Sequence, residues 1–178
     1  AELAERFGAD APVARFRDIA DKMFIPFDEA HGVIAEFEGW TDDRVIKQAD
    51  TTLLIYPWNM PMDTELKRRI VDYYRAHYPP RKIMMGSAID GIIDCQLGRL
   101  DHAMEAFRDL LPHFHPPYFT ASESPVNDCM NFLTGIGGLL QLLLMGFGGI
   151  RVDAQGLHIP DSPPAGPMQV TLRSGAKP

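Results

Sequence analysis

Clusters of basic residues are scarce in this sequence. Its 178 residues include 17 lysines and arginines against 24 aspartates and glutamates, which gives a net charge of −7. The densest basic group, residues 67–69, lies in a segment with helical periodicity, where it forms the wet face of an amphipathic helix. This balance argues against a nucleic-acid partner or an anionic membrane surface, because both require a basic patch.

Cysteine is also scarce. Cys95 and Cys129 are too few for a disulfide framework, and the sequence has no Cys-x-x-Cys or Cys/His spacing typical of a metal site. We expect both cysteines to be buried thiols, and a bridge between them is disfavoured because few small intracellular proteins carry one. The sequence therefore predicts no metal centre.

The two ends of the sequence lack the features of a complete protein. The chain begins AELAERFG, without Met and without a signal sequence, and it stops at VTLRSGAKP soon after strand-like patterning has begun. We therefore expect a fragment of a larger protein. The missing signals say little about the localisation of that protein, although the cytoplasm is favoured.

Apolar residues with helical spacing are plentiful. They make up 46% of the chain against 23% charged residues, which is the composition of a globular domain. Residues 33–40 alternate as a short extended segment, and residues 50–56 form a short apolar stretch stopped by Pro57. The spacing predicts amphipathic helices at residues 13–24, 63–78, 87–97 and 100–111.

The segment from about residue 131 to 145 is apolar on all faces. Its apolar run falls short of the ~20 residues that a membrane span needs, and it contains Gln141 and several glycines. We therefore interpret it as a buried inner helix and not as a membrane span.

The pattern changes beyond Gly148. Prolines and glycines punctuate a two-residue alternation that indicates β structure, as in Ile150/Val152, Leu157/Ile159 and Val170/Leu172. We place a domain boundary here, with residues 1–148 as part of a helical domain and 149–178 as the beginning of a β domain. Outer amphipathic and inner apolar helices in alternation suit an α/α toroid, in which the loops of the inner helices converge on one end and can build a pocket.

Acidic and aromatic residues gather in AEFEGW, where Glu36 and Glu38 flank an aromatic ring and Trp40 is close. Carbohydrate pockets combine ring stacking with carboxylates in this way. The alternative is a surface strand with outward carboxylates, which is the commoner arrangement.

Lys47 and Gln48 stand just before the short apolar segment at 50–56. Together they can donate several hydrogen bonds to hydroxyl or phosphate oxygens. The alternative is an ordinary polar helix entry, which the residues alone favour. His113 and His115 would share one face of a strand, but a third metal ligand is not evident nearby, so polar surface is the simpler interpretation.

The polar loop FTASESPVNDCMN contains Glu123, Asn127, Asp128 and Asn131 and leads into the apolar helix. Polar loops held on rigid helices often carry functional sites. The alternative is a helix entry in which Ser, Asp and Asn cap the helix and Glu123 is solvated.

Two segments, VIKQADTTLLIYP and NFLTGIGGLLQLLLMGFGGIRV, resemble glycoside hydrolase family 65, and weaker similarity extends through ADKMFIPFDEAHGVIAEFEGW. The family includes disaccharide phosphorylases and a hydrolase branch with acid trehalases and a hydroxylysine-linked glucosidase. The resemblance is to the hydrolase branch. It implies a mainly α fold, part of an (α/α)6 barrel followed by a small β-rich C-terminal domain, and an α-glucoside substrate handled with inversion and without metal or organic cofactor.

The resemblance also implies roles for particular residues. Glu123 in TASESP matches the base that activates water, and Lys47 and Gln48 match the pair that binds glucose in the cleaved subsite. Asn131 stands where the phosphorylases use a histidine around phosphate, and MMGSAID replaces their serine-rich loop. A phosphate ion would have fewer donors and a repelling carboxylate nearby, so hydrolysis is the better prediction. Trp40 is predicted to contact the substrate.

The general acid of the family lies in a motif that has no counterpart here and, by the alignment, would precede Ala1. We therefore expect this chain to hold half of an active site and to be inactive on its own. An inverting disaccharide phosphorylase and a non-catalytic helical interaction module remain the alternatives.

Overall fold

The structure is a computed structural model that describes residues 1–48, 50–80, 82–126, 129–153 and 155–167. The helices within these residues are α1 (Glu2–Arg6), α2 (Val13–Lys22), α3 (Asp50–Ile55), α4 (Thr64–Ala76), α5 (Met84–Gln96), α6 (Leu100–Leu110) and α7 (Leu133–Gln141), with a 3-10 turn at Leu111–His113 and a π-helix at Leu142–Phe147. The strands form three antiparallel pairs: β1 (Phe27–Asp28) with β2 (Val33–Ile34), β3 (Phe114–His115) with β4 (Thr120–Ala121), and β5 (Arg151–Asp153) with β6 (Gly156–His158).

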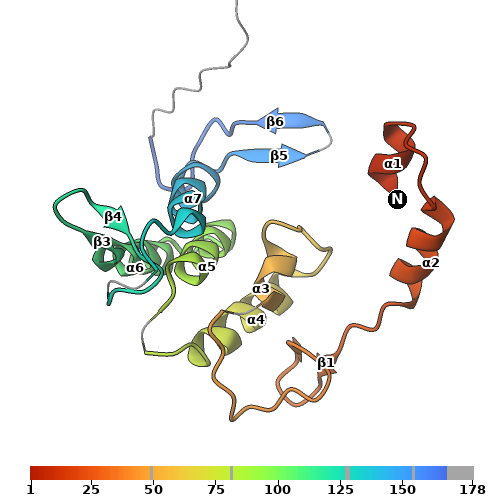
Figure 1. Ribbon diagram of the computed structural model, residues 1–178, viewed down its shortest axis with the longest axis horizontal. Helices are drawn as coiled ribbons and strands as arrows, with labels where there is room; N and C mark the ends of the chain where they lie inside the picture. Colours follow the sequence, from red (N-terminus) through yellow and green to blue (C-terminus); the bar gives the residue numbers. More distant parts are fainter. Residues whose placement is uncertain (49, 81, 127–128, 154, 168–178) are drawn as a thin grey trace, which may run out of the picture.

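The core is built around α5. This helix packs against α6, α7 and the π-helix, as Figure 1 shows, and 11 of its 13 residues are buried. The predicted hairpin of α5 and α6 is confirmed, and the chain reverses at Gly98, which adopts the left-handed φ of +74° that glycine tolerates. The mainly α fold predicted from the sequence is therefore confirmed.

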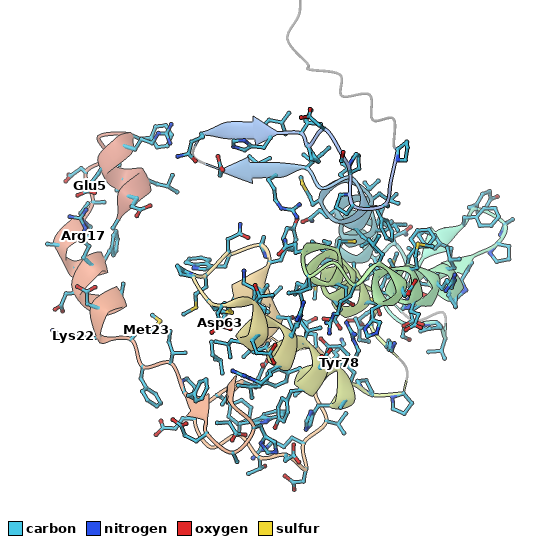
Figure 2. The ribbon with its side chains drawn as sticks, turned by 180° about the vertical axis from the view of Figure 1, so that it is seen from behind. Glu5, Arg17, Lys22, Met23, Asp63 and Tyr78 are labelled. Atoms are coloured by element: carbon cyan, nitrogen blue, oxygen red, sulfur yellow. The ribbon has the colours of Figure 1, made fainter. Side chains whose placement is uncertain are left out.

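Helix α4 begins at the predicted cap. The Asp63 carboxylate accepts the backbone N–H of Leu66 at 2.7 Å, which satisfies one of the unpaired donors of the first turn. Figure 2 labels Asp63 at this end of the helix and Tyr78 just beyond the other end. The buried face of α4, with Ile70, Val71 and Tyr74, packs on α3 and β2.

The N-terminal arm, residues 1–25, stands apart from this body (Figure 1). The predicted helix at 13–24 is confirmed as α2, but within the described chain neither α1 nor α2 contributes a buried residue, and Phe16 and Ile19 are exposed. An exposed ion pair of 2.6 Å joins Arg17 of α2 to Glu5 of α1, and Figure 2 labels both residues. The apolar spacing correctly predicted a helix here, but the apolar face of α2 is not buried against any described part of the chain.

The structure corrects two predictions: the complete burial of the apolar helix α7, and the length of the extended segment at 33–40. The helix expected to be wholly buried, α7, has only two buried residues, Gly135 and Gly138, while Leu133 and Leu140 are exposed. Extended structure in 33–40 is limited to β2, because the chain turns after Ala35. The predicted inner helix begins at Leu133 and continues into the π-helix as far as Phe147.

Beyond Gly148 the expected β structure is present as the β5–β6 hairpin, while the Val170/Leu172 alternation lies outside the described residues. The domain boundary at 148/149 and the closure of an (α/α)6 barrel stay predictions. Among the described residues, no helix combines the length and the apolarity that a membrane crossing requires.

Candidate active site

The loop that carries Glu123 is fixed from both sides. It follows β4, and the Ser122 N–H donates to the carbonyl of His113 at 2.9 Å. The Ser122 hydroxyl is buried and lies 2.5 Å from the Ser124 carbonyl, which accepts its hydrogen bond. Further along, the Phe132 N–H donates to the Ala121 carbonyl at 3.0 Å, so the loop is closed at its far end as well. Glu123 therefore projects from a tethered backbone.

The same loop is joined to the start of α5. The Glu123 carbonyl accepts the backbone N–H of Met84 at 3.1 Å, so it satisfies one of the N–H groups that the first turn of a helix leaves without a partner. The Glu123 side chain is 22% exposed, which leaves its carboxylate accessible at the surface of this junction.

Lys47 comes from a distant part of the sequence and forms an ion pair with the Glu123 carboxylate. Its side chain is 60% exposed, so the ammonium group reaches the carboxylate from the solvent side. The structure thus brings together two of the predicted site residues. Pairs with this exposure are worth at most about 1 kcal/mol, so the contact can open when a ligand competes for it.

Gln48 lies against the first turn of α5. Its Cβ is 4.0 Å from the position that a Cβ on Gly86 would occupy. The cavity here is small and is lined by Gln48, Thr52, Leu53, Met85, Gly86 and Ile89. Lys47 and Gln48 therefore both reach the end of α5 at which the Glu123 loop is attached.

Asn131 is exposed at the entry to α7 and adopts a left-handed φ of +60°. Asparagine tolerates this conformation better than most residues, which explains its use at a tight turn before a helix. Asn127 and Asp128, the other polar candidates of this loop, lie outside the described residues.

Trp40 packs against aromatic residues at the C-terminal end of α4. Its indole N–H donates to the Tyr73 hydroxyl at 2.8 Å, and its ring packs at 5.6 Å from the rings of Tyr74 and His77. The indole donor is therefore already used within the protein. Substrate stacking by Trp40 stays a prediction.

Glu36 differs from both sequence interpretations. Its carboxylate accepts the backbone N–H groups of Asp50 and Thr51, the latter at 3.2 Å, and also the Thr51 hydroxyl at 3.0 Å. Both Glu36 oxygens are therefore used by the start of α3, so this carboxylate caps α3 across the fold and does not point outward from a surface strand. Burial raises its pKa, while these hydrogen bonds act in the opposite direction.

The two histidines of the HFH motif anchor the Glu123 loop. His113 is fully buried, not at the polar surface as expected, and its Nδ1 lies 3.1 Å from the Ser122 carbonyl. Burial lowers the pKa of His113, which favours the neutral ring with Nδ1–H as the donor. His115 bonds through Nε2 to the Ser122 hydroxyl at 2.7 Å. No cluster of His, Cys, Asp or Glu in the described part of the chain is arranged to hold a metal ion.

The cysteines are separate thiols. Cys95 is buried as predicted, whereas Cys129 is exposed, so the expectation of two buried thiols is wrong for the second.

The helices contain a buried ionic network that the sequence patterns did not predict. Asp94 is fully buried and accepts hydrogen bonds from Arg75 Nη2 at 2.7 Å and Arg99 Nε at 2.8 Å. Asp90, one turn earlier on α5, accepts the Tyr78 hydroxyl at 3.3 Å, and burial raises its pKa to about 7. The spacing of two aspartates four apart in an apolar helix was the signal that could have revealed this network.

The sequence of this chain is similar to those of several known carbohydrate enzymes. The chain is 35% identical over 150 residues to the protein-glucosylgalactosylhydroxylysine glucosidase of Danio rerio, which covers 84% of this chain and 23% of that protein. It is 38% identical over 140 residues to the kojibiose hydrolase of Flavobacterium johnsoniae, covering 78% of this chain and 20% of that protein. An acid trehalase of Candida glabrata is 28% identical, with 77% of this chain and 12% of that protein covered. No protein-family model matches the chain.

One solved structure, assigned as a kojibiose phosphorylase from the human microbiome, superimposes with a TM-score of 0.59. The match covers 91% of this chain and 25% of that one at 17% identity, so it supports the fold alone. The chain spans about a fifth to a quarter of the length of the first two relatives.

Proposed function

The chain belongs to the family 65 group of glycoside hydrolases, and from this premise we propose that it supplies the base-bearing part of an inverting α-glucoside hydrolase. Its relatives carry the names of a glucosidase, a kojibiose hydrolase and an acid trehalase. The proposed reaction releases glucose from an α-glucosyl disaccharide or glycoconjugate.

Glu123 is the proposed general base. Inversion needs one carboxylic acid that protonates the leaving oxygen and one carboxylate that activates water on the opposite face of the sugar, about 6.5–9.5 Å away. Glu123 fits the second role because it is partly exposed on a loop whose backbone is tethered to α5 and to His113, at the end of the 3-10 turn. A base held in this way keeps its orientation towards the bound water.

The contact between Lys47 and Glu123 is the observation that carries the proposal. Lys47 and Glu123 are distant in sequence but in contact in the structure. The family resemblance assigns Glu123 to catalysis and Lys47 to sugar binding. A lysine ammonium has three N–H donors, so Lys47 can keep one on the carboxylate and donate another to a sugar hydroxyl. Gln48, on the same end of α5, is the proposed second donor.

Asn131 and Trp40 are the remaining proposed substrate contacts. Asn131 is exposed next to the start of α7 and can offer both a donor and an acceptor to a hydroxyl group. Trp40 can offer only the free face or edge of its ring, since its N–H is bonded to Tyr73. We assign Asn131 the larger share of the binding energy.

The general acid is assigned to residues outside this chain, so the 178 residues alone are expected to leave α-glucosides intact. The test therefore uses an enzyme of the relatives' length that contains this chain. In it, Glu123→Gln should lower kcat by about 10²–10⁴-fold, the usual contribution of a general base. The exposed Glu38→Gln is the matched control and should leave kcat unchanged.

The products separate the possible outcomes. Glucose released as the β-anomer without added phosphate, followed by proton NMR, supports the proposal. Glucose 1-phosphate formed only with added phosphate would establish the phosphorylase alternative. Equal activity of the Glu123→Gln and Glu38→Gln enzymes would refute the role of Glu123, and an inactive parent enzyme would favour a helical interaction module.

A further inference from the structure

We infer that Glu36 is a positioning residue that holds Lys47 against Glu123 by capping α3. The inference rests on the proposed function for its catalytic meaning, but the contact itself can be tested without catalysis. It assigns a role to a carboxylate that lies outside the proposed catalytic groups.

The Glu36 carboxylate is fully engaged by the start of α3. One oxygen accepts the Asp50 N–H, and the other accepts the N–H and the hydroxyl of Thr51 at 3.2 and 3.0 Å. The first N–H groups of a helix have no partner within the helix, so a carboxylate at this position stabilises its first turn. Glu36 does so from a segment fourteen residues away in sequence.

Glu36 can act as a fixed point because its own backbone is clamped to α4. The preceding residues Val33, Ile34 and Ala35 are buried, and the Tyr74 hydroxyl donates to the Ile34 carbonyl at 2.8 Å. Tyr74 is itself fully buried in the core. The Arg69 Nε adds a 3.0 Å hydrogen bond to the Gly32 carbonyl. The position of the carboxylate is therefore set by the core.

The end of α3 that Glu36 holds is the end next to Lys47 and Gln48. Helix α3 has only six residues, and a helix this short is marginal without tertiary contacts at its ends. If the first turn of α3 at Asp50 and Thr51 unwinds, the backbone at Lys47 and Gln48 is no longer held in one orientation. The Lys47–Glu123 ion pair would then be occupied for a smaller fraction of the time, because a partly exposed pair is weak.

The contact is measured by the rate at which an amine-reactive acylating reagent modifies Lys47, read by mass spectrometry on the full chain. Pairing with a carboxylate protects the ammonium. Glu36→Ala should raise the Lys47 rate by about two- to fivefold, the range that a partly exposed ion pair allows, and Glu123→Gln should raise it equally. Glu36→Gln keeps one acceptor oxygen and should fall between.

Asp63→Ala is the matched control, because it removes the cap of α4 while leaving α3 untouched. It should lower the melting temperature as Glu36→Ala does, yet leave Lys47 labelling at the wild-type rate. An unchanged Lys47 rate in Glu36→Ala, or an equal rise in Asp63→Ala, would overturn the inference.

In the enzyme of the relatives' length, Glu36→Ala should raise KM several-fold with a smaller fall in kcat, and Glu36→Gln should restore part of the loss. A purely structural role would lower the amount of active enzyme and leave KM unchanged. If labelling responds while the wild-type enzyme does not hydrolyse α-glucosides, the positioning stands and the proposed hydrolysis fails.

Discussion

Helices α5 and α7 pack against each other and both begin at the Glu123 loop, yet their surroundings differ. Eleven of the 13 residues of α5 are buried, against two of the nine in α7. The enclosed helix carries two aspartates, whereas the open one carries no charge and was expected to be the buried one. Burial in this chain therefore follows the number of packing neighbours, and α5 has α3, α6, α7 and the π-helix around it.

The carboxylates of α5 are tolerated because cations reach them from neighbouring helices. Arg75 comes from α4 and Arg99 from the turn before α6, and both bond to Asp94. The open helix α7 instead touches α5 through glycines, as the absence of a Cβ on Gly138 lets Ala88 approach. Helix α5 is therefore held by ionic bonds to neighbouring helices, whereas α7 is held by the close approach of its backbone to α5. Substitutions in the two helices test these two kinds of contact independently.

The largest effect is expected from Asp94→Ala. It removes the buried carboxylate that Arg75 and Arg99 share and leaves them the Asp90 contact at 3.6 Å and the Asp72 pair at 2.7 Å. Breaking a buried pair costs up to about 5 kcal/mol of unfolding free energy. Urea denaturation measures this cost. The exposed Asp18–Lys22 pair on α2 is the control, and Asp18→Ala should cost less than about 1 kcal/mol. Equal losses in the two variants would contradict the buried network.

The pH dependence of stability should report on Asp90. Burial raises its folded pKa to about 7, above the ordinary value of 3.8, so the folded protein keeps a proton that the unfolded chain has released. The Asp90 contribution to the unfolding free energy is therefore complete below pH 4 and is lost as the pH rises to about 7. At about 1.4 kcal/mol per pKa unit, the upper bound of this loss is about 4.5 kcal/mol.

Asp90→Asn should remove this slope. Urea unfolding of the wild type and of the variant at pH 5 and pH 8 gives the difference, and the wild type should lose more stability between the two values. Asp21→Asn, in the exposed arm, controls for the loss of one negative charge. A parallel fall of wild type and Asp90→Asn would show that Asp90 does not take up the proton.

Two neighbouring glycines on α7 give opposite predictions. A Cβ on Gly138 would lie 2.8 Å from the Ala88 Cβ, so Gly138→Ala should destabilise by about 1–3 kcal/mol through overpacking. A Cβ on Gly137 would meet no atom within 4 Å, so Gly137→Ala should stabilise by about 0.5–1 kcal/mol through reduced chain entropy. The same sign for both variants in thermal unfolding would contradict the placement of α7 on α5.

The helices could be predicted from the sequence because local signals determine them. The Asp63 cap, the prolines and the left-handed Gly98 set their ends to within a few residues. Packing partners could not be predicted in the same way. Apolar spacing forms α2 and α6 alike, but α6 packs on α5 while α2 stays in the arm.

The candidate site shows the same division. Glu123, Lys47 and Gln48 were found from motifs, and the contact between the first two could be seen only in three dimensions. The capping role of Glu36 was hidden because its partners are backbone N–H groups fourteen and fifteen residues away. Sequence motifs can identify side chains that take part in catalysis or binding. A hydrogen bond to a distant backbone N–H group does not depend on the type of the donor residue, so no motif reveals it.

The smallest effect is expected on the outer face of α7. Leu140 is 54% exposed, so Leu140→Gln in this chain should change the unfolding free energy by no more than about 0.5 kcal/mol. In an enzyme of the relatives' length, closure of the proposed barrel would cover this face, and the same substitution should then cost about 1.5–3 kcal/mol, the transfer free energy of a buried leucine. Urea denaturation of both proteins gives the two values. Equal small values would argue against closure over α7, and a large cost in the 178-residue chain that grows with protein concentration would indicate that a second copy covers the face.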